Sequence, residues 1–167
     1  MKAETEKIVY DESIRVIEGQ EASLENLRTR AGTLISAAAL VTAFLAPPAL
    51  SKGTITLTLR AAQSTHIHFA SYSWAATSAF VGVAVSALAI LWPYGWTFGH
   101  NAHSLMDQHL DRKYPSDEAK IYRHLAYYNE VNHSENAKKL NRLFGIFALG
   151  CVLLVVEIGL WLTALVR

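Results

Sequence analysis

The sequence predicts an all-α membrane protein with three transmembrane helices, and three observations carry this prediction. Of the 167 residues, 51% are hydrophobic and only 17% are charged, against about a quarter charged in typical soluble domains. Windows 31–50, 69–93 and 143–166 together contain one charged side chain, Glu157. Each window supplies the roughly 20 apolar residues that a helix needs to cross a bilayer core. Three such segments cannot close a barrel, so helices are the remaining spanning structure.

Residues 1–30, before the first span, are predicted to form a cytoplasmic amphipathic helix. Apolar side chains recur there at intervals of three, four and seven residues, which places them on one stripe of a helix. The stripe consists of Tyr10, Ile14, Ile17, Leu24, Leu27 and Ala31. The segment holds seven acids and five bases and lacks the apolar run of a signal peptide. The first hydrophobic window is therefore expected to act as the insertion signal.

The first span, 31–50, is expected to end at Pro47 and Pro48, because proline lacks a backbone N–H donor and clashes with the preceding turn. Residues 51–68 are then expected to form an external loop. Within it, residues 54–59 alternate threonine with aliphatic side chains, which fits a short strand. A lone strand leaves its edges unpaired, so this loop either lies on the membrane surface or pairs with a second copy.

The second span, 69–93, has aromatic residues at both ends, as is usual at membrane interfaces. Residues 94–142 are predicted to form a cytoplasmic helical hairpin, with a first helix over about 101–113. Ser116 is the expected N-cap of its second helix, whose pattern allows it to continue unbroken into the third span, 143–166. That second helix is predicted to present Ile121, Leu125, Tyr128 and Leu140 on one side.

Basic residues predict the orientation of these spans. The tail before the first span has five basic residues and the segment 94–142 has seven, whereas the opposite side has Lys52, Arg60 and Arg167. The positive-inside rule therefore places the N-terminus and 94–142 in the cytoplasm and the C-terminus outside. This makes the chain a multi-pass protein of the plasma (inner) membrane. With no internal repeat or low-complexity linker, residues 1–167 are predicted to form a single membrane-spanning domain.

Glu157 is the candidate functional residue of the spans, because an ionisable side chain in hydrocarbon is expensive and marks a function by default. Three interpretations remain open. Its carboxyl group is hydrogen-bonded between packed helices, lines a polar path in an oligomer, or lies near the outer interface marked by Trp161, one helical turn later.

Small residues at four-residue spacing are candidates for helix packing, because they let helices approach closely in lipid. The pairs are Gly32 with Ser36, Ala75 with Ala79, and Gly82 with Ser86. Packing within one chain and packing between copies of a homo-oligomer explain these pairs equally well.

A weak metal candidate lies after the second span. His100, His103 and Asp107 stand at i, i+3 and i+7 and share one helix face, where such groups can bind a borderline metal. Polar residues are also expected where a helix leaves the membrane, and no zinc-peptidase signature accompanies them. We therefore assign no metal site.

No pattern of an enzyme is present. The single cysteine, Cys151, lies among aliphatic residues, and no nucleophile elbow, P-loop or dinucleotide motif occurs. We therefore expect no catalytic residue and no cofactor. The net charge of +1 gives no support for nucleic-acid binding.

Several segments resemble those of small actinobacterial three-span membrane proteins. They are the entry into the first span at 24–34, the end of the second span at 91–93, the cytoplasmic runs 121–126 and 136–140, and a last span with Glu157 and Trp161. The layout as a whole resembles the transmembrane effector modules of Pycsar-type antiphage systems, which respond to nucleotide signals.

This resemblance implies a non-enzymatic antiviral effector that assembles in the inner membrane as a pore-like homo-oligomer and impairs it when a cyclic nucleotide appears. The chain has no recognisable cyclic-nucleotide-binding domain, so sensing would fall to the helical bundle or to a cytoplasmic protein partner. The alternative hypothesis is a structural or accessory membrane protein that anchors a cytoplasmic partner through its helices.

Overall fold

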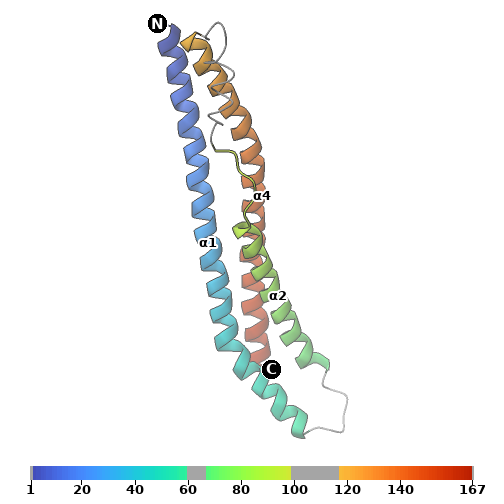
Figure 1. The fold of residues 1–167 in the computed structure, drawn as a ribbon. Helices are drawn as coiled ribbons and strands as arrows, with labels where there is room; N and C mark the ends of the chain where they lie inside the picture. The colour runs from blue at the N-terminus through green and yellow to red at the C-terminus, as the bar shows by residue number, and fades with distance from the viewer. Residues whose placement is uncertain (1, 60–66, 99–116, 167) are drawn as a thin grey trace. The chain divides into compact units, whose positions relative to one another are not determined.

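The computed structural model describes residues 2–59, 67–98 and 117–166, with side chains over 3–49, 72–98 and 117–166. These residues form three long helices, α1 (Lys2–Leu59), α2 (Ile67–Leu91) and α4 (Glu118–Val166) (Figure 1). Each helix contains a stretch long and apolar enough to cross a membrane. The predicted all-α class and its three membrane-compatible helices are confirmed.

Helix α1 buries a row of side chains that repeats every seven residues. The buried members are Ile17, Gln20, Leu24, Leu27, Ala31, Leu34 and Ala38. Alternating steps of three and four residues keep one face of a helix turned toward its neighbours. The predicted apolar stripe is therefore confirmed, although Tyr10 and Ile14 at its start are only half-buried.

Pro47 and Pro48 lie inside α1, which continues to Leu59, so the helix end predicted at this pair is wrong. Proline bends a helix more readily than it ends one in an apolar setting, and Figure 1 shows α1 bending toward its C-terminal end. The strand predicted for 54–59 is also wrong, since these residues are helical. A helix pairs the backbone groups of the segment internally, whereas a lone strand leaves them unpaired.

Contacts divide the chain into two compact units, of which unit 1 comprises residues 1–26 and 93–142. Within it, the first parts of α1 and α4 run side by side in the same direction. Three contacts join them in matching order along both helices: Glu6 with Arg123, Ser13 with Asn129, and Gln20 with His133. The Glu6 carboxylate raises the pKa of the Arg123 guanidinium, mainly through their hydrogen bond, but the Arg123 side chain is largely exposed, so the pair adds little stability.

Asparagines, rather than the predicted aromatic side chain, form much of the buried row of α4 in unit 1. Asn129, Asn132 and Asn136 are buried, as is Leu125, whereas Tyr128 is 38% exposed. The prediction that placed Tyr128 on the packed side is therefore wrong. Hydrogen bonds explain the difference, because the amide groups of Asn129 and Asn136 each donate to a neighbouring element, which makes their burial tolerable.

Asp117 caps the first turn of α4. Its carbonyl oxygen accepts hydrogen bonds from the N–H groups of Lys120 at 2.9 Å and Ile121 at 3.2 Å. The cap thus lies one residue after the predicted Ser116, which is outside the described residues, as is the helix predicted for 101–113. From its cap, α4 runs unbroken through 49 residues, which confirms that it continues into the third apolar window.

Unit 2 comprises residues 27–92 and 143–167 and packs segments of all three helices around two small clusters. One cluster contains Leu34, Ala38 and Val83, and the other contains Ala49, Ala76, Trp161 and Ala164. Alanine supplies most of these buried positions, and small side chains let helices approach closely where lipid supplies no hydrophobic drive. The packing of unit 2 is therefore of the kind found between membrane helices.

Cysteine labelling tests the predicted orientation. In a Cys151→Ser background, single cysteines at Asp117 and Arg167 are treated with an impermeant maleimide in intact cells. We expect the probe at the C-terminus to react and the probe at 117 to react only after the membrane is opened. The reverse pattern would show that the chain is inserted the other way round.

Candidate functional site

Glu157 lies in the interior of unit 2, where its exposed fraction is 0%. The hydroxyl group of Thr42 in α1 donates a hydrogen bond of 2.6 Å to its Oε1 atom. Thr42 is half-buried, and 115 residues separate the two partners along the chain. This bond between side chains joins two helices within an apolar span, where hydrogen bonds of this kind stabilise helix association.

The register of α4 explains why this carboxyl group points inward. Side chains buried at intervals of seven run along the helix as Asn129, Asn136, Leu143, Gly150, Glu157 and Ala164. A seven-residue repeat holds one face of a helix toward its partner. Glu157 therefore occupies a packing position that the pattern of the whole helix assigns to it.

Four buried polar atoms of unit 2, including Nε of Arg28, lack a hydrogen-bond partner among the described residues. The other three lie within the apolar windows. They are Oε2 of Glu157, the indole nitrogen of Trp161 and the hydroxyl oxygen of Ser73. Trp161 follows Glu157 by four residues and so lies on the same helix face. Unpaired buried polar groups are costly in an apolar interior. The site thus retains capacity to take a proton or to engage another polar group.

The outer surfaces of these helices are apolar. The exposed large side chains of the three apolar windows include Leu40, Phe44, Val81, Val85, Leu88, Leu149, Val152, Val155, Val156 and Leu162. Exposed hydroxyl groups, such as that of Ser36, donate to carbonyl oxygens of their own helix. Among the described residues, Glu157 is thus enclosed by helices whose exposed large side chains are apolar.

The small residues singled out in the sequence have different surroundings. A Cβ atom at Gly82 would lie 2.9 Å from Leu153 Cδ1, and Ser86, which donates to the Gly82 carbonyl oxygen, is buried. This pair packs within the chain. Ala79 is also buried, whereas Ser36 and Ala75 are exposed and a Cβ atom at Gly32 would meet nothing within 4 Å.

Gly150 makes an approach as close as that of Gly82, but it was not among the small residues predicted from the sequence. A Cβ atom there would lie 2.9 Å from Leu34 Cδ2 in α1 and 3.3 Å from Ser86 Cβ in α2. The seven-residue repeat of small and polar side chains along α4 was the signal that could have identified it. Thr42 had no such signal, because nothing in its local sequence relates it to Glu157.

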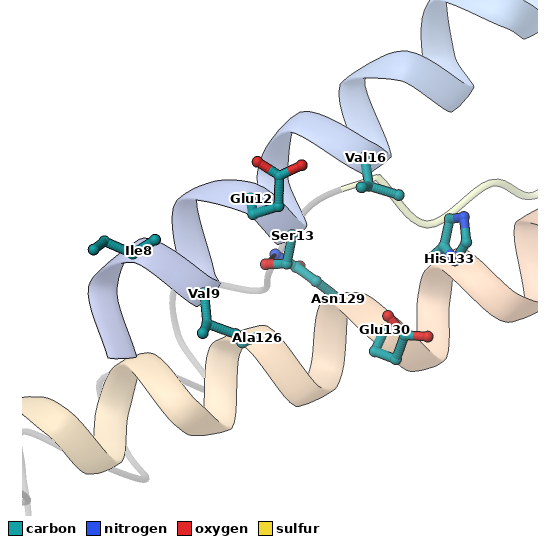
Figure 2. A pocket seen from close by; sticks show the side chains of 9 residues that line it. All are labelled: Ile8, Val9, Glu12, Ser13, Val16, Ala126, Asn129, Glu130 and His133. Carbon is teal, nitrogen blue, oxygen red and sulfur yellow. Dashed lines mark hydrogen bonds between the residues drawn. The ribbon is translucent and has the colours of Figure 1, made fainter. Parts of the chain in front are cut away.

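Unit 1 carries a groove of about 410 Å³ between α1 and α4 (Figure 2). It is lined by Ile8, Val9, Glu12, Ser13, Val16, Ala126, Asn129, Glu130 and His133. Ile8 and Val9 are 65% and 52% exposed, and Figure 2 shows the carboxyl groups of Glu12 and Glu130 on opposite helices. The apolar stripe predicted for α1 does not reveal this groove, because Val9 and Val16 lie beside the buried row of the helix.

The weak metal candidate His100, His103 and Asp107 lies outside the described residues. Within the residues that are described, no group of three potential metal ligands occurs. Comparison with known proteins found no matching family model, no matching curated protein and no matching solved structure.

Proposed function

We propose that this protein is a non-enzymatic membrane effector that couples binding at unit 1 to the packing of its spans. The observation that carries the proposal is the continuity of α1 and α4, which are single helices of 58 and 49 residues. The groove of unit 1 lies on these two helices, and so does the Thr42–Glu157 hydrogen bond of unit 2. Each helix thus offers a continuous backbone through which binding at the groove can affect the spans.

The chemistry of the groove favours a protein partner. Its lining includes apolar side chains such as Ile8 and Val9, and the carboxylates of Glu12 and Glu130 contribute negative charge. Lys and Arg are absent from its described lining. Phosphate groups bind where Arg, Lys or helix N-termini concentrate positive charge. The groove therefore suits an apolar segment with basic residues better than a cyclic nucleotide, and in an antiphage system the nucleotide signal would reach this chain through such a partner.

Self-association in the inner membrane belongs to the same proposal. Ser36 and Ala75 are exposed small residues on α1 and α2, which suits close approach of a second copy in lipid. In the described residues, one copy has no polar path across the membrane through Glu157, because this side chain is enclosed within the chain. Assembly of several copies would therefore be the way in which the effector impairs the membrane.

A second candidate function is that of a membrane anchor for a cytoplasmic partner complex. The enclosed carboxyl group and the apolar outer faces of the spans favour it, since a pore needs polar side chains along its path. In this case the groove would hold the partner without changing the membrane.

A membrane-potential dye in cells that overexpress the chain separates the two functions. We expect the effector to depolarise the cells, and Val9→Glu with Val16→Glu to abolish depolarisation, because these changes remove two apolar side chains on which the apolar part of the partner would pack. The matched control is Tyr127→Glu with Val131→Glu, two exposed positions of unit 1 outside the groove lining. An unchanged potential with normal growth would instead support the anchor, and equal behaviour of both double variants would remove the groove from the mechanism.

A further inference from the structure

A short aromatic segment follows α2 in unit 1 and is fixed to α4. Residues 93–98 are not helical, because proline at 93 lacks the N–H that a continuing helix needs. The rings of Trp96 and Phe98 stack with centroids 5.7 Å apart and an interplanar angle of 4°. Two side chains of α4, Asn136 and Lys139, bind the backbone of this segment. We refer to residues 94–98 as the aromatic platform.

The contacts of the aromatic platform leave it little freedom. Asn136 Nδ2 donates to the carbonyl oxygen of Thr97 at 3.0 Å, and Asn136 is only 1% exposed. Lys139 Nζ donates to the carbonyl oxygen of Gly95 at 2.7 Å and lies 5.9 Å from the centre of the Trp96 ring. The ammonium group is thus held by a carbonyl and an aromatic face together.

Beside this platform, α4 carries two free cations. Lys138 and Arg142 are exposed, and neither has a hydrogen-bond or ion-pair partner among the described residues. They stand at i and i+4 and so lie on one side of the helix. Glu135 is the nearest acid in sequence and lies beyond Lys138, away from the apolar window that begins at Leu143. Among the described residues, no acid lies between the two cations along α4 or between them and that window.

The spacing of these groups matches the layer of lipid headgroups. Lys138 to Arg142 covers about 6 Å along a helix, and the headgroup layer on each side of a bilayer is roughly 5–8 Å thick. Arg142 directly precedes the apolar window, and Tyr94, which is 40% exposed, belongs to a residue class enriched at this depth.

We propose that Lys138 and Arg142, together with the aromatic platform, form a binding site for the phosphate of an anionic phospholipid headgroup such as phosphatidylglycerol. The two cations supply charge and N–H donors to the phosphate oxygens. The platform, held by Asn136 and Lys139, positions aromatic rings against the interfacial region of the same lipid. Basic pockets beside membrane helices bind anionic headgroups in this way.

Native mass spectrometry of the full chain, released from mixed phosphatidylcholine and phosphatidylglycerol nanodiscs, tests the site. We expect selective retention of phosphatidylglycerol, weakened roughly 10- to 30-fold by Lys138→Gln with Arg142→Gln, since each basic residue contributes a factor of about five near an anionic surface. The matched control, Lys7→Gln with Lys120→Gln, removes the same charge from exposed positions elsewhere in unit 1 and should retain the lipid. Equal retention of both lipids, or equal loss in both double variants, would overturn the proposal.

Two further measurements test the lipid site without relying on the double glutamine variant. Raising the salt concentration from 0.1 to 0.5 M should weaken retention by the wild-type chain, which tests the charge contribution even if the double glutamine variant does not fold. Soluble glycerol phosphate at the same concentration as the lipid should not displace it. Displacement by the soluble anion would assign the two cations to a free phosphate ligand and would refute the lipid site.

Discussion

Thr42→Val is expected to destabilise the protein by about 1–3 kcal/mol, because it removes the hydrogen bond that the Thr42 hydroxyl donates to Glu157. Valine keeps the shape of threonine, so the packing of α1 stays nearly the same. The buried Glu157 carboxyl group would then lose its Thr42 partner, while its Oε2 atom already lacks one among the described residues. The measurement is the free energy of unfolding in a mixed-micelle titration with a denaturing detergent.

Glu157→Leu is expected to be neutral or stabilising in the same assay. Leucine has a similar volume and removes the unpaired Oε2 atom, whose burial in an apolar setting is unfavourable. The Thr42 hydroxyl left behind has an alternative, because several hydroxyls of these helices donate to the carbonyl oxygen four residues earlier. The double variant Thr42→Val with Glu157→Leu should be no less stable than Glu157→Leu alone.

The three variants form a double-mutant cycle. If the changes in the free energy of unfolding caused by Thr42→Val and Glu157→Leu simply add in the double variant, the two side chains act independently, and their hydrogen bond does not contribute to stability. Glu157→Gln separates stability from function, since it keeps size and hydrogen bonding but removes the charge. If Glu157 serves only packing, depolarisation by the glutamine variant should equal that of the wild type. A lost or altered response from a stable variant would show that the carboxyl group is kept for a role in the effector.

Among alanine substitutions at the glycines of α4, Gly150→Ala is expected to destabilise the protein most. It should lower the free energy of unfolding by about 1–3 kcal/mol. The new methyl group would lie 2.9 Å from Leu34 Cδ2 and 3.3 Å from Ser86 Cβ. The leucine end can rotate, but Ser86 Cβ is attached directly to the backbone of α2. Helix α2 would therefore have to shift, and contacts of the Leu34, Ala38 and Val83 cluster would loosen.

Gly145 and Gly159 supply matched controls on the same helix, because a Cβ atom at either position meets nothing within 4 Å. Alanine there should leave the free energy of unfolding unchanged or raise it slightly, since glycine is the weaker helix former. Gly82→Ala should be intermediate, because only the mobile end of Leu153 blocks it. Equal effects at all four glycines would show that helix propensity, and not close packing, controls the response.

Charge and periodicity, both local properties of the sequence, determined the helical class and the three apolar windows. Placing a charge in hydrocarbon is so costly that windows with a single acid, Glu157, can be identified without any knowledge of contacts. The stripe of α1 followed in the same way from the period of one helix. The local rules failed at Pro47, Pro48 and 54–59, where α1 continues because a helix pairs its backbone hydrogen-bonding groups internally. They also failed at Tyr128, which is partly exposed while neighbouring asparagines of α4 are buried.

Only the tertiary structure decided which distant residues meet. The pairing of Thr42 with Glu157, the contact of Gly150 with Leu34 and Ser86, and the docking of the aromatic platform on Asn136 and Lys139 all join segments that are at least 39 residues apart. Each depends on the axial register between two helices or between a helix and a loop. That register is set by the sum of many weak packing contacts along the elements, and no single window of sequence contains it.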